Sequence, residues 1–438
     1  MRRVNQTARG FVFGVRVFHR LGGHHADHSW APSPSLGEGR RSVTLRILVV
    51  GAGVGGISIA RGLLRDGHDV VVFERRPAVQ AGGGAVTIWS NGETVLGQLG
   101  VDMDGAGQVL SAVRILTSTG RLLAVLDLTA MAQRLGAPVR MVPRRTLMDR
   151  MLNNIPAQRI RCGFDAVRVV REDDGARVEF GDGGSAEGDV VIGADGLHST
   201  VRDGVGAPHA KSTGWCSWQG LVELPDLAEK QVAQVIIGRC GNTGLWPAGD
   251  SNVQWWFDLP WSPDFVRPQH PIAMIRSNFI GWSDAVDSVL AALTDDDLAG
   301  SPYPHFRHPI THSGCGPVTL LGDAAHTMPP TLAQGANQAL LDTMVLCRAL
   351  SAFGSSDVLT ALRWYEKTRR RNVTAVSRVA SLQVAHGESV LRPAAIISDR
   401  LHTWALTTFL SQTSHRRMSE AIVRSRYAAQ SAASCALR

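Results

Sequence analysis

The stretch that decides the fold is LRILVVGAGVGGISIARGLLRDGHDVVVFE, residues 45–74 of the 438-residue chain. Its first six residues form a short apolar, β-branched run, which predicts a strand buried on both faces, and residues 70–73 predict a second such strand. Between them, apolar residues at helical spacing from Ile57 to Leu64 predict a helix that stops near Asp66. These thirty residues therefore predict one complete βαβ unit.

The turn between the first strand and the helix has the pattern G-x-G-x-x-G, made by Gly51, Gly53 and Gly56. The first glycine permits a tight turn, the second lets a pyrophosphate approach the backbone, and the third lets the helix pack on the strand. The helix N-terminus then offers free N–H groups to the phosphates. Glu74 ends the second strand, where a carboxylate accepts hydrogen bonds from ribose hydroxyls, so FAD or NAD fits better than NADP.

Two later segments repeat the order of strand, turn and helix. Residues 189–202 read DVVIGADGLHSTVR, and residues 320–337 read LLGDAAHTMPPTLAQGAN. Each places an aspartate, Asp195 or Asp323, directly after a buried strand, at the sheet edge where α/β proteins bind ligands. A helix N-cap is the alternative for both, and it is stronger for Asp195, because Ser199 also suits a helix start.

With these three motifs in this order, the chain resembles the FAD-dependent aromatic hydroxylases, the single-component flavoprotein monooxygenases of the p-hydroxybenzoate hydroxylase type. The resemblance spans about 46–370. The segments GGAVTIWSNG (83–92) and WQGLVE (218–223) are similar to small bacterial members such as urate hydroxylases. The implied fold class is α/β: a Rossmann-type FAD-binding domain with an inserted mixed or antiparallel β-sheet substrate domain and a C-terminal helical extension.

The domain boundaries follow from this organisation. We expect a discontinuous FAD-binding domain at 46–120, 140–212 and 308–362, and a substrate-binding sheet at 213–307 with strands from 84–140. Residues 213–282 read as several strands, and helical patterns run over 335–352, 358–385 and 394–412. We expect C-terminal helices over 363–438 and a disordered extension over 1–45.

The resemblance implies the residues that bind FAD. Glu74 and Arg75 would hold the adenosine ribose, Arg144 the pyrophosphate or ribityl chain, and Asp323 the ribityl hydroxyls, while Asp195 belongs to a motif shared with the nicotinamide cofactor. For Arg144, a surface ion pair or replacement by Arg145 is the alternative. The backbone N–H groups of Ala333, Gln334, Gly335, Ala336 and Asn337 would face the flavin. Gly55 and Thr87 complete the expected cofactor site.

Two features of the third motif stand out. Pro329 and Pro330 would form a rigid wall facing the isoalloxazine, although they could simply stiffen the loop. Ala333 stands where the family usually has glycine, so an added methyl group is expected close to the flavin. His326 lies inside this motif, and we expect it to be structural.

The substrate is expected on the tryptophan-rich sheet, since eight of the eleven tryptophans fall in 89–282. Trp218, Trp246 and Trp256 are predicted to stack on a planar substrate, and Gln219 to make one polar contact. For each tryptophan alone, a place in the core is an equal alternative. Few charged residues accompany them, which predicts a small, mostly apolar substrate.

The family implies the chemistry. NADH or NADPH, docking transiently because the chain has one dinucleotide motif, reduces FAD; O2 adds at flavin C4a, and the hydroperoxide hydroxylates an electron-rich aromatic or heteroaromatic ring. The alternatives are a same-fold epoxidase or other oxidoreductase acting on an alkene or polyketide-like substrate, and a non-catalytic FAD-binding protein.

Charge and composition exclude other classes. The net charge of +7 comes from residues 1–45 (+5) and 363–438 (+9), whereas 46–362 carry −7, so no nucleic-acid-binding face is expected. The six cysteines include no C-x-x-C pair, which argues against a zinc site and favours a cytoplasmic protein. No apolar run is long enough to span a membrane, and we expect a monomer or homodimer.

Overall fold

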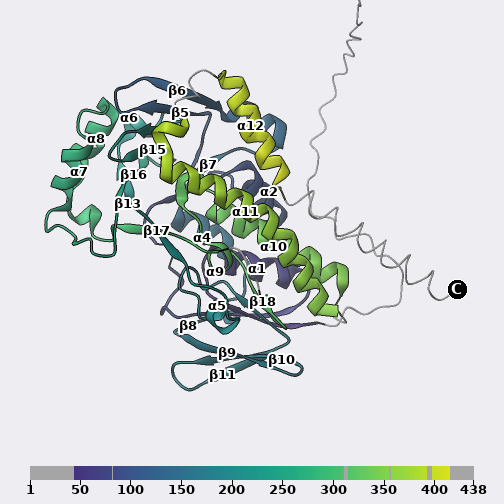
Figure 1. The fold of residues 1–438 in the computed structure, drawn as a ribbon. Coiled ribbons are helices and arrows are strands. Elements are labelled where there is room, and N and C mark those ends of the chain that lie inside the picture. The colour runs from purple at the N-terminus through teal and green to yellow at the C-terminus, as the bar shows by residue number, and fades with distance from the viewer. Residues whose placement is uncertain (1–43, 81, 310–313, 355–356, 392–396, 415–438) are drawn as a thin grey trace, which may run out of the picture.

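The structure, a computed structural model, describes residues 44–80, 82–309, 314–354, 357–391 and 397–414. It is a mixed α/β fold with one parallel sheet, one larger antiparallel sheet and two small three-stranded sheets (Figure 1). The predicted α/β class is confirmed. The expected extension over 1–45 lies outside the described residues, apart from Thr44 and Leu45, and so does the end of the chain from 415 onward.

The six-stranded sheet brings the three motifs together. Its strands lie in the order β18-β19-β12-β1-β2-β8, and all neighbours are parallel except β18 and β19. The bounds are β1 Arg46–Val50, β2 Asp69–Glu74, β8 Ile160–Cys162, β12 Val190–Gly193, β18 Gly314–Cys315 and β19 Val318–Leu320. The strands that precede the three motifs, β1, β12 and β19, are therefore adjacent, and their carboxyl ends meet at one edge.

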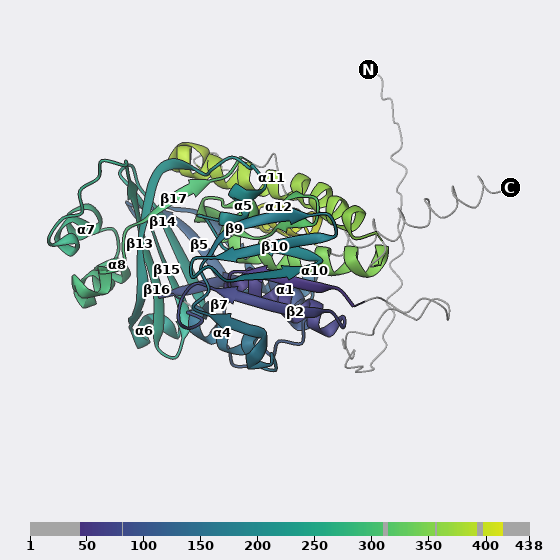
Figure 2. The same ribbon diagram turned by 90° about the horizontal axis from the view of Figure 1, so that it is seen from below.

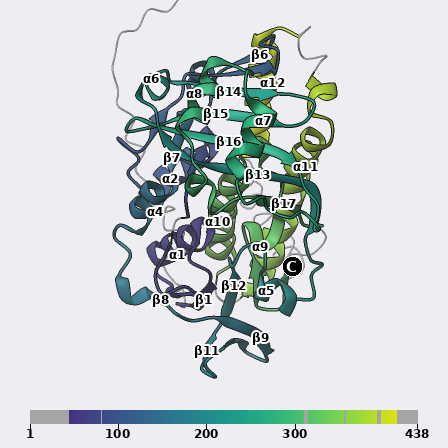
Figure 3. The ribbon, with the colours of Figure 1, turned by 90° about the vertical axis from the view of Figure 1, so that its left-hand side faces the viewer.

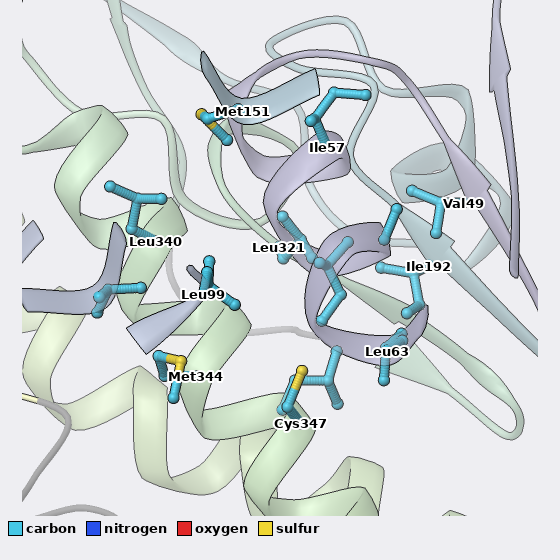
Figure 4. Close-up of a cluster of buried hydrophobic side chains, with 14 of the residues drawn as sticks. Val49, Ile57, Leu63, Leu99, Met151, Ile192, Leu321, Leu340, Met344 and Cys347 are labelled. Atoms are coloured by element: carbon cyan, nitrogen blue, oxygen red, sulfur yellow. The ribbon is translucent and has the colours of Figure 1, made fainter. Parts of the chain in front are cut away.

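Both faces of this sheet are covered, as the continuous apolar strands predicted. One face packs on α1 (Val54–Arg65), α4 (Arg144–Leu152) and the long α10 (Gly335–Phe353). Figure 4 shows Ile57 and Leu63 of α1 in this core with Met344 and Cys347 of α10. The other face is covered by the antiparallel strands β9 (Ala166–Glu172), β10 (Gly175–Phe180) and β11 (Ser185–Gly188), as Figure 2 shows.

The seven-stranded sheet has the order β17-β13-β16-β15-β14-β5-β6 and is antiparallel except for the pair β14–β5. The bounds are β5 Ala112–Thr117, β6 Leu122–Asp127, β13 Lys211–Glu223, β14 Val232–Ile237, β15 Asn242–Gly249, β16 Asn252–Pro260 and β17 Tyr303–Arg307. Strands β5 and β6 come from the segment 84–140, whose strands are expected in this sheet, although 46–120 is also assigned to the FAD-binding domain.

The two faces of the seven-stranded sheet carry separate cores. The outer face is covered by α7 (Pro271–Phe279) and α8 (Asp284–Ala292), with the short α6 (Pro225–Ala228) close by (Figure 3). Helix α7 corrects the expectation that 213–282 contains strands only. The inner face, which looks toward the rest of the protein, packs on α3 (Leu128–Leu135) and α12 (Asp399–Gln412). We call its buried residues the sheet-face cluster: Ala85, Trp89, Leu110, Val113, Leu128, Met131, Val139, Met141, Ala233, Trp246, Ala248 and Leu410.

A third small sheet connects the two large ones. It contains β3 (Ala85–Ile88), β7 (Arg140–Pro143) and β4 (Gln108–Val109), and α2 (Ser90–Gln98) follows β3. The remaining helices are α5 Thr200–Gly204, α9 Asp323–His326 and α11 Val358–Leu391, with single 3-10 turns at Ala157–Arg159, Asp296–Leu298 and Pro330–Leu332.

The predicted boundary between 362 and 363 is wrong. Helix α11 is continuous from Val358 to Leu391, and Ala361, Leu362 and Tyr365 lie in the same core as α10. The helical patterns at 335–352, 358–385 and 394–412 correspond to α10, α11 and α12. Within the described ranges, no helix has the length and apolar content required to cross a bilayer.

Candidate active site

The turn of the first motif lies directly against the loops of the other two. Gly51 has φ 101°, and a Cβ atom on it would lie 2.5 Å from the carbonyl oxygen of Ala194 and 2.9 Å from Cα of Asp195. A Cβ atom on Gly55 would lie 2.6 Å from Cδ1 of Leu321. Three stretches far apart in the sequence therefore share one edge of the parallel sheet, and the backbone of the second stretch leaves no room for a side chain at Gly51.

The start of α1 is open where a phosphate group would need space. A Cβ atom on Gly56 would lie 1.8 Å from the carbonyl oxygen of Gly51, whereas one on Gly53 would meet nothing within 4 Å. Gly53 caps the helix, and its carbonyl accepts the first helical hydrogen bond, from Ile57 at 2.9 Å. The preceding N–H groups of the first turn are unused within the helix and can bind an anion.

Glu74 is fixed beside that turn. One carboxylate oxygen accepts the Ala52 N–H at 3.0 Å and the other accepts the Arg76 N–H at 3.1 Å. Each oxygen keeps a second lone pair, so the half-buried carboxylate can also accept hydrogen bonds from ribose hydroxyls. Arg75 is exposed.

Asp323 and Arg144 lie close enough for the charge of each to affect the pKa of the other. The Asp323 side chain is exposed, yet burial raises the pKa of this carboxyl, against the lowering effects of His326 and Arg144. The exposure and the raised pKa are compatible if water reaches part of the side chain while protein atoms surround the carboxyl group. Burial likewise lowers the pKa of Arg144, while Asp323 and Tyr303 act to raise it. A carboxylate and a guanidinium close to each other can bind hydroxyls and phosphates respectively.

The helix-cap alternative has opposite outcomes for the two aspartates. Gly322, and not Asp323, caps α9, so the carboxylate of Asp323 is not used there. Asp195 accepts hydrogen bonds from Ser199 Oγ at 2.5 Å and from the Val201 N–H at 3.2 Å, so its side chain does bind the start of α5. The contribution of Asp195 to the site is thus through its backbone, which packs on Gly51.

The loop before α10 is held by the side chains of residues whose backbone N–H groups are expected to face the flavin. Asn337 is fully buried: its Oδ1 accepts the Trp89 N–H at 2.9 Å, and its Nδ2 donates to the carbonyls of Thr87 at 2.9 Å and Ala333 at 3.0 Å. Gln334, also buried, accepts from Gln338 at 3.0 Å. These amides tie β3 to α10.

Other residues of this loop are placed as follows. The N–H groups of Gly335, Ala336 and Asn337 form the first turn of α10, and the first helical bond outside that turn runs from Gln338 to Gln334. Pro329 is buried and Pro330 exposed. Ala333 has φ 49° and ψ 36°, the left-handed conformation that favours glycine, so its backbone is strained.

A buried ion network that the sequence did not reveal supports the third motif. Asp342 accepts hydrogen bonds from the Gly322 N–H at 2.8 Å, from His326 Nε2 at 2.6 Å and from Arg369 Nε at 2.5 Å. Burial alone would raise the pKa of Asp342, but the charges of His326 and Arg369 outweigh it and hold the pKa at about 2. Nothing in the apolar pattern of α10 signals this carboxylate, which fixes the Gly322–His326 turn.

The predicted substrate residues divide between the two faces of the seven-stranded sheet. Gln219 pairs with Trp256 across β13 and β16, and Trp246 lies on the same inner face, with its ring centroid 5.9 Å from that of Trp256. Trp218 is fully buried on the opposite face, among the residues that pack on α7 and α8. Trp218 therefore faces away from Gln219, Trp246 and Trp256, because alternate residues of a strand face opposite sides.

Two inner-face residues were missed. Tyr303 of β17 is 43% exposed and close enough to Arg144 to affect its pKa. Gln254 of β16 accepts the Ala85 N–H, which joins the sheet to β3. The one available signal was the rarity of tyrosine, with three in the chain.

Comparisons with known proteins agree with this arrangement. The sequence model described as FAD binding domain matches residues 44–380. An FAD-dependent urate hydroxylase of Klebsiella pneumoniae is 31% identical over 333 residues, which cover 74% of this chain and 86% of the relative. A 3-amino-4-hydroxybenzoate 2-monooxygenase of Streptomyces cremeus is 32% identical, with 77% and 86% covered.

Among solved structures, Klebsiella pneumoniae HpxO complexed with FAD and uric acid superposes with a TM-score of 0.76 at 26% identity, covering 84% of this chain and 97% of that one. A 2-methyl-3-hydroxypyridine-5-carboxylic acid oxygenase, at 22% identity and a TM-score of 0.68, shares the fold. The chain belongs to the FAD-binding-domain family, and it is an FAD-dependent oxidoreductase of the hydroxylase and monooxygenase type.

Proposed function

We propose that the protein uses FAD, NADH or NADPH, and O2 to hydroxylate a small, mostly apolar aromatic or heteroaromatic substrate. The observation that carries the proposal is the meeting of the three motifs at one sheet edge, beside the inner face of a tryptophan-bearing sheet. Relatives that hydroxylate urate or aminohydroxybenzoate support the aromatic class. FAD fits the site because the open Gly53 turn and the carboxylate of Asp323 suit its phosphates and hydroxyls.

In this proposal the chain's own residues bind and orient. The α1 N-terminus holds the pyrophosphate, Glu74 the adenosine ribose, Arg144 and Asp323 the ribityl region, and the first turn of α10 the flavin edge. Once bound and reduced by the nicotinamide, FAD supplies the oxygen-transfer chemistry with O2. Pro329 and Pro330 stiffen the loop that faces it, and the apolar inner face keeps water from the reacting ring.

The inner face predicts a neutral substrate. Around Trp256 its side chains include Gln219, Leu221, Trp246 and Gln254, none of them charged. The carboxyl group on this face, Asp258, is buried and accepts a hydrogen bond from Ser217. The Trp246 Nε1 atom is buried and has no acceptor among the described residues, so it can donate to a substrate oxygen. Gly244 lets the Trp256 ring lie flat against the strand, because a Cβ atom there would lie 1.9 Å from that ring. A planar ring with one oxygen substituent fits these groups.

The reaction is tested with purified, FAD-loaded protein. Oxidation of NADH and of NADPH is measured with phenols, indoles, purines including uric acid, and an alkene as the alternative substrate class. The expected result is stimulated oxidation with an aromatic compound and a product carrying one oxygen atom from ¹⁸O₂ by mass spectrometry. If only the alkene gains an oxygen atom, the protein is an epoxidase. If no product carries ¹⁸O, the protein is not an oxygenase.

The cofactor contact is tested separately. Asp323→Asn is expected to weaken FAD binding by about tenfold, the loss of a charged hydrogen bond to a hydroxyl, as measured by titration of the apoprotein with FAD. Asp284→Asn, at an exposed position on the far side of α8, is the matched control and leaves FAD affinity unchanged. Equal affinities for the two variants would remove Asp323 from the site.

A further inference from the structure

The C-terminal helix α12 is anchored to the edge of the seven-stranded sheet. Strand β6 is the last strand of that sheet, so one side of its backbone has no strand partner. Its Val125 N–H donates to Asp399 Oδ1 at 2.8 Å, and its Asp127 N–H donates to Thr403 Oγ1 at 3.0 Å. Two side chains of α12 thus satisfy backbone donors that an edge strand otherwise leaves open. The helix is fixed in register along this edge (Figure 1).

The inner side of α12 contributes to the sheet-face cluster. Leu406, Phe409 and Leu410 recur at helical spacing, and Leu410 is fully buried in the same cluster as Trp246. Leu406 and Phe409 are half-buried and pack against that cluster, as Trp256 does. The outer side of the helix carries Leu401 and Trp404, each 49% exposed.

Phe409 also packs against a second cluster, which we call the loop cluster. Its buried residues are Met328, Val373 and Val376, with Leu332 packed beside them. Met328 directly precedes Pro329, and Leu332 directly precedes Ala333, so this cluster supports both ends of the 3-10 turn that faces the flavin site. Phe409 is the residue that packs against both clusters.

We propose that α12 forms a wall of the substrate site and that Phe409 sets the size of the ring that fits. This inference rests on the proposed function, which puts the substrate between the tryptophan face and the Pro329–Pro330 turn. Phe409 bridges those two surfaces from the side and is only half-buried, so part of its ring is available for contact. Helix α12 lies beyond residue 380, where the match to the family model ends.

The test compares two binding probes in FAD-loaded protein before any nicotinamide is added. Dissociation constants of phenol and 2-naphthol are measured from the perturbation of the flavin absorbance. Phe409→Ala is expected to shift the affinity ratio toward 2-naphthol by about tenfold, because the lost ring makes room for a second one. Trp404→Ala, on the outer side of the same helix, is the matched control and leaves the ratio unchanged. An unchanged ratio in Phe409→Ala overturns the inference.

A second measurement needs no ligand. Acrylamide quenching of tryptophan emission is expected to rise in Phe409→Ala, because removing the ring exposes the cluster that contains Trp89 and Trp246. The same measurement on Trp256→Phe, with and without the Phe409 substitution, gives the contribution of Trp256 to the change in quenching. If Phe409→Ala does not fold, Phe409→Leu is used in its place. If quenching does not rise, Phe409 does not cover the cluster and the inference is refuted. This result is decisive even if neither phenol nor 2-naphthol perturbs the flavin absorbance.

The two hypotheses fail in different ways. A shifted ratio, or raised quenching where neither probe perturbs the flavin, together with no oxygen insertion into any aromatic compound refutes the proposed reaction and leaves the wall in place. Oxygen insertion with an unchanged ratio and unchanged quenching refutes the wall and leaves the reaction in place.

Discussion

The edge of the parallel sheet and the inner face of the seven-stranded sheet differ in how tightly the backbone constrains the side chains. At the edge, Gly51 and Gly56 lie so close to backbone atoms that no side chain fits, and the requirement is local. On the larger sheet, neighbouring residues such as Trp255 and Trp256 look alike in sequence but face opposite cores. A motif therefore identifies the cofactor, whereas substrate contacts depend on which face a strand turns inward.

The same two regions also differ in the pKa of a buried aspartate. Near the motif edge, His326 and Arg369 hold the pKa of Asp342 at about 2. In the seven-stranded sheet, burial raises the pKa of Asp258 to about 7, because the Ser217 hydroxyl only partly offsets the lost solvation. The first carboxylate stabilises its loop as an anion, whereas burial favours the protonated form of the second.

The largest effect is expected for Gly56→Ala. The added Cβ atom would overlap the Gly51 carbonyl, which lies 1.8 Å from that position, so strand and helix must separate at a cost of at least about 3 kcal/mol. Gly53→Ala is the matched control: nothing lies within 4 Å of its Cβ, so it keeps its stability while losing FAD affinity. Urea unfolding of both apoproteins measures this, and equal stabilities would break the proposed distinction between packing and phosphate-binding glycines.

The next effect separates the two faces of the larger sheet. Trp218→Ala is expected to cost about 3–5 kcal/mol of unfolding free energy, because the ring is fully buried. Trp256→Ala, at a half-buried position, is expected to cost less than half as much and to weaken binding of phenol or 2-naphthol. Chemical unfolding and flavin-absorbance titration measure the two effects. A ligand-binding loss in a folded Trp218 variant would contradict the assignment of faces.

A smaller effect, on the order of 3 kcal/mol, is expected from Asp258→Asn and depends on pH. The folded-state pKa of Asp258, about 7, lies above its unfolded value, so its destabilising effect is absent near pH 4, grows as pH rises to 7 and is constant above. Asparagine keeps the acceptor for Ser217, which lies 2.5 Å from Oδ1. The variant should therefore match wild type near pH 4 and exceed it in stability at pH 8.

Two other titratable groups lie close to Asp258, and the experiment must separate their pH dependence from that of Asp258. His305 Nε2 lies 2.7 Å from Ser217 Oγ, and burial lowers the pKa of His305 to about 4, while Cys216 is the other titratable neighbour. Both remain in the variant, so the difference between variant and wild type isolates Asp258. Asp284→Asn, at an exposed site, should show no such pH dependence. A difference that stays constant from pH 4 to 8 would argue against a buried protonated carboxyl.

The smallest effect is expected for Ala333→Gly, a gain of up to about 1 kcal/mol. Relief of the left-handed strain at φ 49° outweighs the extra freedom of glycine in the unfolded chain. Ala336→Gly, three residues later in the first turn of α10, should instead lose about 0.5–1 kcal/mol, because its backbone is helical. Thermal unfolding of the two apoproteins measures the opposite signs. Destabilisation by both would mean that the Ala333 methyl group contributes packing.

The sequence by itself determined the parallel sheet, the three motifs and the FAD assignment. Each of these depends on a local need: glycine where no Cβ fits, a carboxylate at a strand end, and free N–H groups at a helix start. The tertiary structure alone decided which tryptophans share a face with the site, that Asp195 binds a helix start, and that Asp342 and Arg369 hold the third motif. It also brought Phe409 of α12 to the loop cluster. These outcomes depend on strand register and on contacts between distant segments, which one-dimensional patterns do not encode.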